Sequence, residues 1–178
     1  MRRLLKHTLR RFAGDEAGNA TVEFAILFPL MVTVFLSSIE ISINTFRHSM
    51  LERGMDMAVR NIRLGTGTPP QHDDIKEMVC NFAGVLPDCE NNLRLEMIRV
   101  DMRNFVEPRA DADCIDNSEE VAPVREFVAG QANEMMFLRA CFVFSPVFPG
   151  GGLGYYYDKD GAGNAAMVAS SAFVQEPN

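Results

Sequence analysis

An uncharged stretch from Phe24 to Ile39 constrains this chain more than any other feature. As an α-helix it would be about 24 Å long, short of the roughly 30 Å hydrocarbon core of a bilayer. Extending the helix over residues 20–43 gives about 36 Å, which is enough to cross, and includes Glu23 near one end and Glu40 near the other. The sequence therefore predicts one membrane-spanning helix close to the N-terminus.

The residues before this span are basic. Residues 1–18 carry five basic and two acidic side chains, and positive charge before a single span keeps that end in the cytoplasm. We expect a cytoplasmic N-terminus and a C-terminal domain that lies outside the cytoplasm. At the outer end of the span we expect Glu40 to be solvated at the interface, and a contact with a partner is its alternative role.

The position of a small residue distinguishes this segment from an ordinary secretory signal. Such a signal places small residues after its apolar core, just before the cut, and Ser37-Ser38-Ile39 is a poor match to that pattern. Here Gly18 precedes the core, and Glu23 lies five positions after Gly18. This arrangement resembles a prepilin, in which cleavage after the glycine leaves Asn19 as the new N-terminus and retains the anchor. Asn19 departs from type IV pilins, where Phe or Met is common, which puts N-methylation in doubt.

The residues around Gly18 carry a more specific resemblance. The run Gly-Asn-Ala-Thr-Val-Glu-Phe-Ala from Gly18, followed by Pro29, resembles the opening of the TadE-like pseudopilins of tight-adherence (Flp) pilus systems. The final residues 169–177 are similar to the ending of that family, with Gln175 where Asn is usual. The resemblance covers the first 65 residues and about the last ten. It implies a minor pilin whose partners are a prepilin peptidase, other pilins, the inner-membrane assembly platform and the membrane.

The resemblance also implies roles for individual residues. Gly18 would be read by the peptidase, and Glu23, Phe24 and Pro29 would serve assembly and recognition. In pilins the partner of the carboxylate at the position of Glu23 is the new α-amino group, here that of Asn19, in the same or a neighbouring subunit. The plain alternative is that Glu23 merely marks the start of the span.

Four cysteines lie after the anchor, at positions 80, 89, 114 and 141, with no Cys-x-x-Cys pair. An even number beyond a membrane anchor is typical of disulfides in an oxidising compartment. Three pairings are possible, and we favour Cys80–Cys89 with Cys114–Cys141; four unpaired buried thiols are the alternative.

The remaining pattern predicts an α+β fold of pilin-like layout. It comprises a leader (1–18), a transmembrane helix (19–43), a periplasmic continuation of that helix (44–64) and a periplasmic domain (65–178). Pro29 should kink the helix, and an apolar stripe beyond the membrane should pack against the domain. A second helix is expected at 73–85, capped by Asp73 or Asp74, with Ile75, Val79 and Phe82 buried. Three antiparallel strands are expected at 93–102 (with a bulge), 136–144 and 166–174, and residues 119–133 are ambiguous between helix and turn.

Composition and motifs argue against several functions. Removal of the leader would change the formal net charge from −7 to −10, which disfavours nucleic acid. No catalytic or phosphate-binding motif is present, so we expect no enzyme and no cofactor.

A calcium site at Asp158–Asn164 lacks the distal ligands of an EF-hand, so we expect a glycine-rich turn and no metal. His48 and His72 have no ligand-spaced partners. Two rival functions stay open, a permanently anchored periplasmic binding module and a type II secretion pseudopilin.

Overall fold

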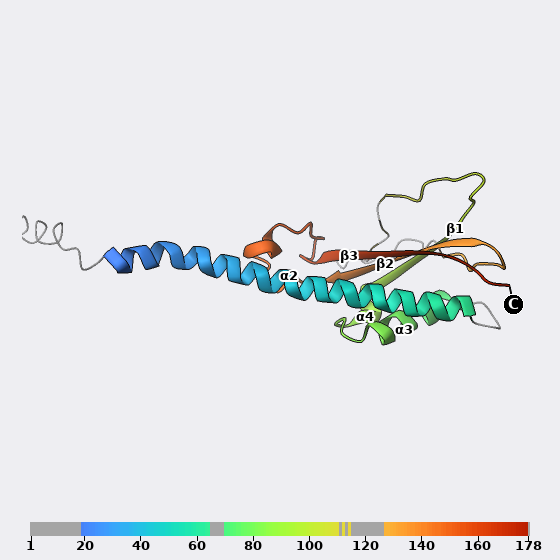
Figure 1. Cartoon of the computed structure of the whole chain (residues 1–178), viewed down its shortest axis with the longest axis horizontal. Coiled ribbons are helices and arrows are strands. Elements are labelled where there is room, and N and C mark those ends of the chain that lie inside the picture. Colours follow the sequence, from blue (N-terminus) through green and yellow to red (C-terminus); the bar gives the residue numbers. More distant parts are fainter. Residues whose placement is uncertain (1–18, 65–69, 111, 113, 115–126, 178) are drawn as a thin grey trace, which may run out of the picture.

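A computed structural model describes residues 19–64, 70–110, 112, 114 and 127–177 of the chain. One long helix, α2 (Asn19–Leu64), lies along a three-stranded antiparallel sheet, as Figure 1 shows. The strands β1 (Leu93–Val100), β2 (Met135–Phe144) and β3 (Ala165–Val174) are ordered β1-β2-β3. Two short helices, α3 (His72–Ala83) and α4 (Cys89–Asn92), precede the sheet. The predicted α+β class is confirmed, and we call residues 70–177 the C-terminal domain.

The two halves of α2 have different surroundings. Side chains from residue 20 to residue 31 are exposed, whereas Leu51, Met55, Ala58 and Ile62 are buried in the core. The helix leaves the sheet and extends far beyond it in Figure 1. It is 46 residues long and includes Pro29. A kink at this proline is not confirmed.

The helix α3 crosses close to α2 because of a glycine. A Cβ atom at Gly54 would lie 2.6 Å from the Val79 carbonyl oxygen, so only glycine allows this approach. Ile75 and Val79 are buried as expected, whereas Phe82 is only half-buried. The predicted cap is wrong: Gln71 is the N-cap, and Asp74 closes a capping box by accepting a hydrogen bond from the Gln71 amide at 2.8 Å.

The expected bulge in the first strand is also wrong. β1 pairs with β2 without interruption from Leu93↔Phe142 to Val100↔Met135. The bulge was expected because the apolar positions shift by one residue along this strand. They do so because both faces of β1 are covered: Leu95 and Met97 face the helices, while Ile98 lies on the opposite face and is half-buried. Residues 119–126, about half of the ambiguous segment, lie outside the described part of the chain. From Phe127 to Asn133 the chain forms an isolated bridge and turns.

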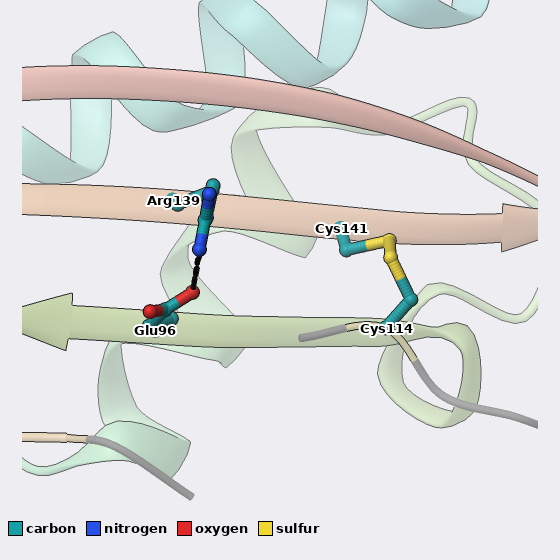
Figure 2. Close-up of a disulfide and its surroundings, with 4 residues drawn as sticks. All are labelled: Glu96, Cys114, Arg139 and Cys141. Carbon is teal, nitrogen blue, oxygen red and sulfur yellow. Dashed lines mark hydrogen bonds and ion pairs between the residues drawn. A yellow bond between two sulfur atoms is a disulfide. The ribbon is translucent and has the colours of Figure 1, made fainter. Parts of the chain in front are cut away.

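The face of the sheet that points away from α2 holds a buried ion pair. Arg139 Nη2 and Nε donate to Glu96 Oε2 at 2.6 and 2.9 Å, across directly paired positions of β1 and β2. Arg139 Nη1 also donates to the Arg109 carbonyl at 2.8 Å, which fixes the segment that follows β1. Figure 2 shows this pair beside the disulfide of Cys141. Loss of either partner would leave a buried charge without compensation.

Both disulfides have the pairing that the sequence favoured. Cys80–Cys89 joins α3 to α4 across a sequence separation of 9, and Cys114–Cys141 joins the segment after β1 to β2 across 27. No described cysteine is free.

The C-terminal residues fix the last turn of α2. Gln175 Nε2 donates to the Ile62 carbonyl at 3.2 Å, and Arg63 Nη2 pairs with Glu176 Oε1 at 3.1 Å. A helix end leaves carbonyls without partners, so the tail of β3 supplies one donor to the end of a helix more than a hundred residues earlier. This contact explains why a residue with a side-chain amide suits position 175.

The two disulfides should differ in their contribution to stability. On the chain-entropy account, removing Cys80–Cys89 by a double alanine substitution costs about 2–3 kcal/mol, and removing Cys114–Cys141 costs about 3–4 kcal/mol because its loop is longer. Urea unfolding of the full chain in detergent, followed by circular dichroism, measures both. A larger loss for the shorter loop would contradict this account.

An ion pair at the end of the sheet where β1 ends and β2 begins should make the free energy of unfolding depend on pH. The Arg99 guanidinium, 2.7 Å away, lowers the pKa of Glu134 below its ordinary 4.5, with help from the Gln131 amide. A lowered folded-state pKa contributes stability above the unfolded pKa, and this contribution is lost as pH falls through the folded value. We expect the stability difference between the wild type and Glu134→Gln to be constant at neutral pH and to shrink below about pH 4.5. Arg99→Gln should behave alike, and a difference that grows in acid would contradict the assignment.

Candidate functional site

The first half of α2 has the properties of a membrane span. It is the one helix in the described part of the chain that is long and apolar enough, with a mean hydropathy of 2.1 in its most apolar window and 6% of that window buried. The core helix of a soluble protein would be mostly buried. A removable signal sequence would not continue without a break into the core, as α2 does at Leu51 and Met55. This helix is therefore a candidate membrane span that cannot be removed without cutting a core element.

The residues expected to serve processing and assembly lie at the start of this helix. Gly18 falls outside the described residues, and Asn19 is the first residue of α2. Glu23 is exposed, and no described residue donates a hydrogen bond to it or forms an ion pair with it. Positions 19 and 23 are one turn apart on the same helical face. Phe24 is exposed, and its ring lies 5.1 Å from that of Phe28.

Three hydroxyl groups of α2 have hydrogen-bond partners within the helix. Thr33 donates to the Pro29 carbonyl, Ser37 to the Thr33 carbonyl and Ser42 to the Ser38 carbonyl, each at 2.8 Å. In hydrocarbon every polar group needs an internal partner, and these side chains have one. Their presence is therefore compatible with a helix that faces lipid.

The expectation that Glu40 is solvated is wrong. Its side chain is 1% exposed, and its two oxygens accept hydrogen bonds from the amides of Val147 (3.0 Å) and Phe148 (2.9 Å). Both amides belong to the segment after β2, which folds back over the helix and removes this carboxylate from solvent. A buried carboxylate requires such donors. Glu40 is therefore the point at which the C-terminal domain is attached to the outer end of the apolar stretch.

The segment that covers Glu40 runs close along α2. We call residues 145–157 the tyrosine loop; it contains the short 3-10 helix η2 (Gly152–Tyr155), which lies beside α2 in Figure 1. A Cβ atom at Gly152, where φ is +58°, would lie 2.8 Å from Ser37 Oγ. Farther along, Asn44 Nδ2 donates to the Tyr157 hydroxyl at 2.6 Å. The loop thus contacts the helix from Ser37 to Asn44.

Sequence reasoning could not have found this contact. A lone acidic residue at the end of an apolar run is a visible signal, but nothing local indicates which distant segment covers it. The partners are backbone amides more than a hundred residues away, and backbone donors leave no trace in residue identity.

The other polar candidates have structural partners. Asp160 Oδ1 accepts from the amides of Ala162 (3.0 Å) and Asn164 (2.7 Å), and Oδ2 accepts from Asn164 Nδ2 at 3.3 Å. These bonds build a turn of the expected glycine-rich kind. His48 Nε2 lies 3.1 Å from the Val168 carbonyl and His72 Nδ1 lies 2.7 Å from Asp73 Oδ1. No group of three possible metal ligands was found among the described residues.

Replacing Glu40 should loosen the tyrosine loop. Glu40→Ala leaves two partly buried amides without acceptors, and the loss for each should be at or below the roughly 1–3 kcal/mol of a fully buried unsatisfied group. Hydrogen exchange at Val147 and Phe148 should become faster in the full chain in detergent. Glu52→Ala is the matched control, since Glu52 is exposed on the same helix. Unchanged protection in Glu40→Ala would show that these bonds do not hold the loop.

Comparison with known proteins agrees with the geometry. Residues 18–60 match the model of the TadE-like protein family, a range that covers the apolar half of α2, Glu23, Glu40 and the start of the buried half. No curated protein and no solved structure matches the chain. The match bears out the resemblance of the opening residues over this range, and the chain carries a TadE-like segment at residues 18–60.

Proposed function

We propose that this protein is a minor pilin, or pseudopilin, that takes part in assembly of a tight-adherence (Flp-type) pilus. In this proposal the leader lies in the cytoplasm and a prepilin peptidase cuts after Gly18. The mature chain stays anchored through α2, with its C-terminal domain in the periplasm. The protein is then a substrate of processing and a structural subunit, and not an enzyme.

The single observation that best supports this proposal is the continuity of α2. One helix without a break supplies both an exposed apolar half and a buried half that forms the core of a sheet domain. A subunit of this kind can move from a bilayer into a bundle of like helices without refolding, because the same exposed face serves both environments. The family match begins at Gly18, the residue after which the cut is proposed.

Glu23 is the residue that such a bundle would use. A carboxylate costs about 2.5–3.5 kcal/mol at the centre of a bilayer and less near its edge. When neighbouring helices pack around it, the charge needs a cation, and cleavage after Gly18 would create an amino group at Asn19, one helical turn away. Within the described residues Glu23 has no partner of its own. This supports a role for Glu23 in contact with the mature N-terminus of the same or a neighbouring subunit.

Two other functions share part of this architecture. A permanently anchored periplasmic binding module would have the same helix and domain but would never polymerise, and it would tolerate replacement of Glu23. A type II secretion pseudopilin would share the cleavage and the role of Glu23 but serve another machine. Deletion of the gene should abolish pilus assembly if the protein is a minor pilin of a tight-adherence pilus. It should abolish protein secretion if the protein is a type II secretion pseudopilin.

The test is the substitution Glu23→Ala in the native host. We expect the variant to be cut and anchored as the wild type is, because neither step needs the carboxylate. It should no longer co-purify with the other pilins, because the amino group would lack its counter-charge. Immunoprecipitation after mild crosslinking, with the cut followed by mobility on a denaturing gel, measures both effects.

The matched control is Glu52→Ala, the same change on the exposed part of the same helix outside the apolar stretch. It should leave co-purification unchanged. Normal co-purification of Glu23→Ala would contradict the assembly role and favour the anchored binding module.

A further inference from the structure

We propose that the tyrosine loop, residues 145–157, enters the outer interface of the membrane that holds α2, with Tyr155 and Tyr156 among the lipid headgroups. The proposal rests on the part of the proposed function that makes α2 a membrane span. The surface concerned belongs to the C-terminal domain, and the role as a pilin does not assign a partner to it. The partner that we propose for this surface is the lipid headgroup region.

The composition of the loop supports a lipid partner. Residues 145–157 read Ser-Pro-Val-Phe-Pro-Gly-Gly-Gly-Leu-Gly-Tyr-Tyr-Tyr and contain no charged side chain. Tyr155 is 66% exposed and Tyr156 is 79% exposed, and Val147 is exposed as well. Tyrosine is enriched at membrane interfaces, because its ring lies against acyl chains while its hydroxyl reaches water. The first charged residues after the loop are Asp158 and Lys159, which suit the headgroup region.

The position of the loop along α2 places it at the right depth. The close approach of Gly152 to Ser37 fixes η2 beside the helix, and the bonds from Val147 and Phe148 to Glu40 fix the start of the loop. Exposed apolar side chains of α2 occur from Val22 to Phe35, and Ile41 and Phe46 are exposed farther along the helix. The loop therefore lies beside the outer end of the exposed apolar stretch, so a membrane that covers this stretch reaches the loop.

The burial of Glu40 extends the part of α2 that lipid can cover. With Glu40 exposed, the uncharged surface of the helix would stop at Ile39 and measure about 24 Å. With Glu40 covered by the loop, it continues to Phe46, just before Arg47, and measures about 35 Å. The hydrocarbon core of a bilayer is about 30 Å thick. The longer stretch spans and the shorter one does not, so the loop completes the surface that the membrane needs.

The absence of tryptophan from the chain gives a direct test. Single-tryptophan variants of the full chain, reconstituted in phosphatidylcholine vesicles with acyl chains brominated near the headgroup, report contact with lipid by loss of fluorescence. Tyr156→Trp probes the loop and Tyr155→Trp repeats the measurement. Phe28→Trp probes the span. Phe105→Trp is the matched control, because Phe105 is an equally exposed aromatic residue (62%) in the segment that follows β1.

We expect Tyr156→Trp and Phe28→Trp to lose fluorescence in brominated vesicles and to emit at shorter wavelength than Phe105→Trp. Only Phe105→Trp should be quenched fully by acrylamide from the aqueous side. If Tyr156→Trp behaves as Phe105→Trp while Phe28→Trp is quenched by lipid, the loop proposal is wrong and the anchor stands. If Tyr156→Trp is protected from both quenchers, the loop contacts protein, which also overturns the proposal. If Phe28→Trp is not quenched by lipid, the membrane span fails, and both proposals fail with it.

Discussion

The structure depends on one constraint, that a single helix must suit two environments without a break. The first half of α2 exposes an apolar surface, and the second half buries Leu51, Met55 and Ile62 in the core of the C-terminal domain. The change occurs between Ser37 and Glu40, where the tyrosine loop closes over the helix. Two backbone amides from that loop satisfy the Glu40 carboxylate. A helix with no such covering would place a charge where its apolar surface is still too short to cross a bilayer.

The rest of the fold keeps the second half of α2 in place. α3 crosses it at Gly54, the sheet covers its apolar stripe, and the C-terminal tail bonds to its last turn through Gln175. On the far face of the sheet, the Cys114–Cys141 disulfide and Arg139 both attach the segment that follows β1. The Cys114–Cys141 disulfide and the buried ion pair thus lie on the face of the sheet away from α2, and the exposed half of the helix remains free to contact lipid or other helices.

The sequence predicted the elements whose signal is local. Uncharged length marked the span, the apolar stripe beyond it marked the continuation of the helix to residue 64, and the three expected strands lie close to β1, β2 and β3. The misses required information from distant residues. The bulge in β1 was inferred from a shift in the apolar pattern, yet the strand is buried on both faces, so Ile98 fits the regular register. Glu40 looked like an interfacial charge because its partners are backbone amides that sequence does not distinguish. Gln71 was passed over as a cap because Asp73 and Asp74 are the commoner choice.

The most direct test of this account is the N-terminus and intact mass of the wild-type protein extracted from its native membrane. The account predicts a chain that begins at Asn19, retains all of α2, and reverts to full length when the prepilin peptidase gene is deleted. A protein that still begins at Met1 in the wild type would contradict the pilin mechanism and leave an anchored binding module. A start near residue 40 would contradict the whole account, since it would remove the anchor and cut α2 at the residue that attaches the tyrosine loop.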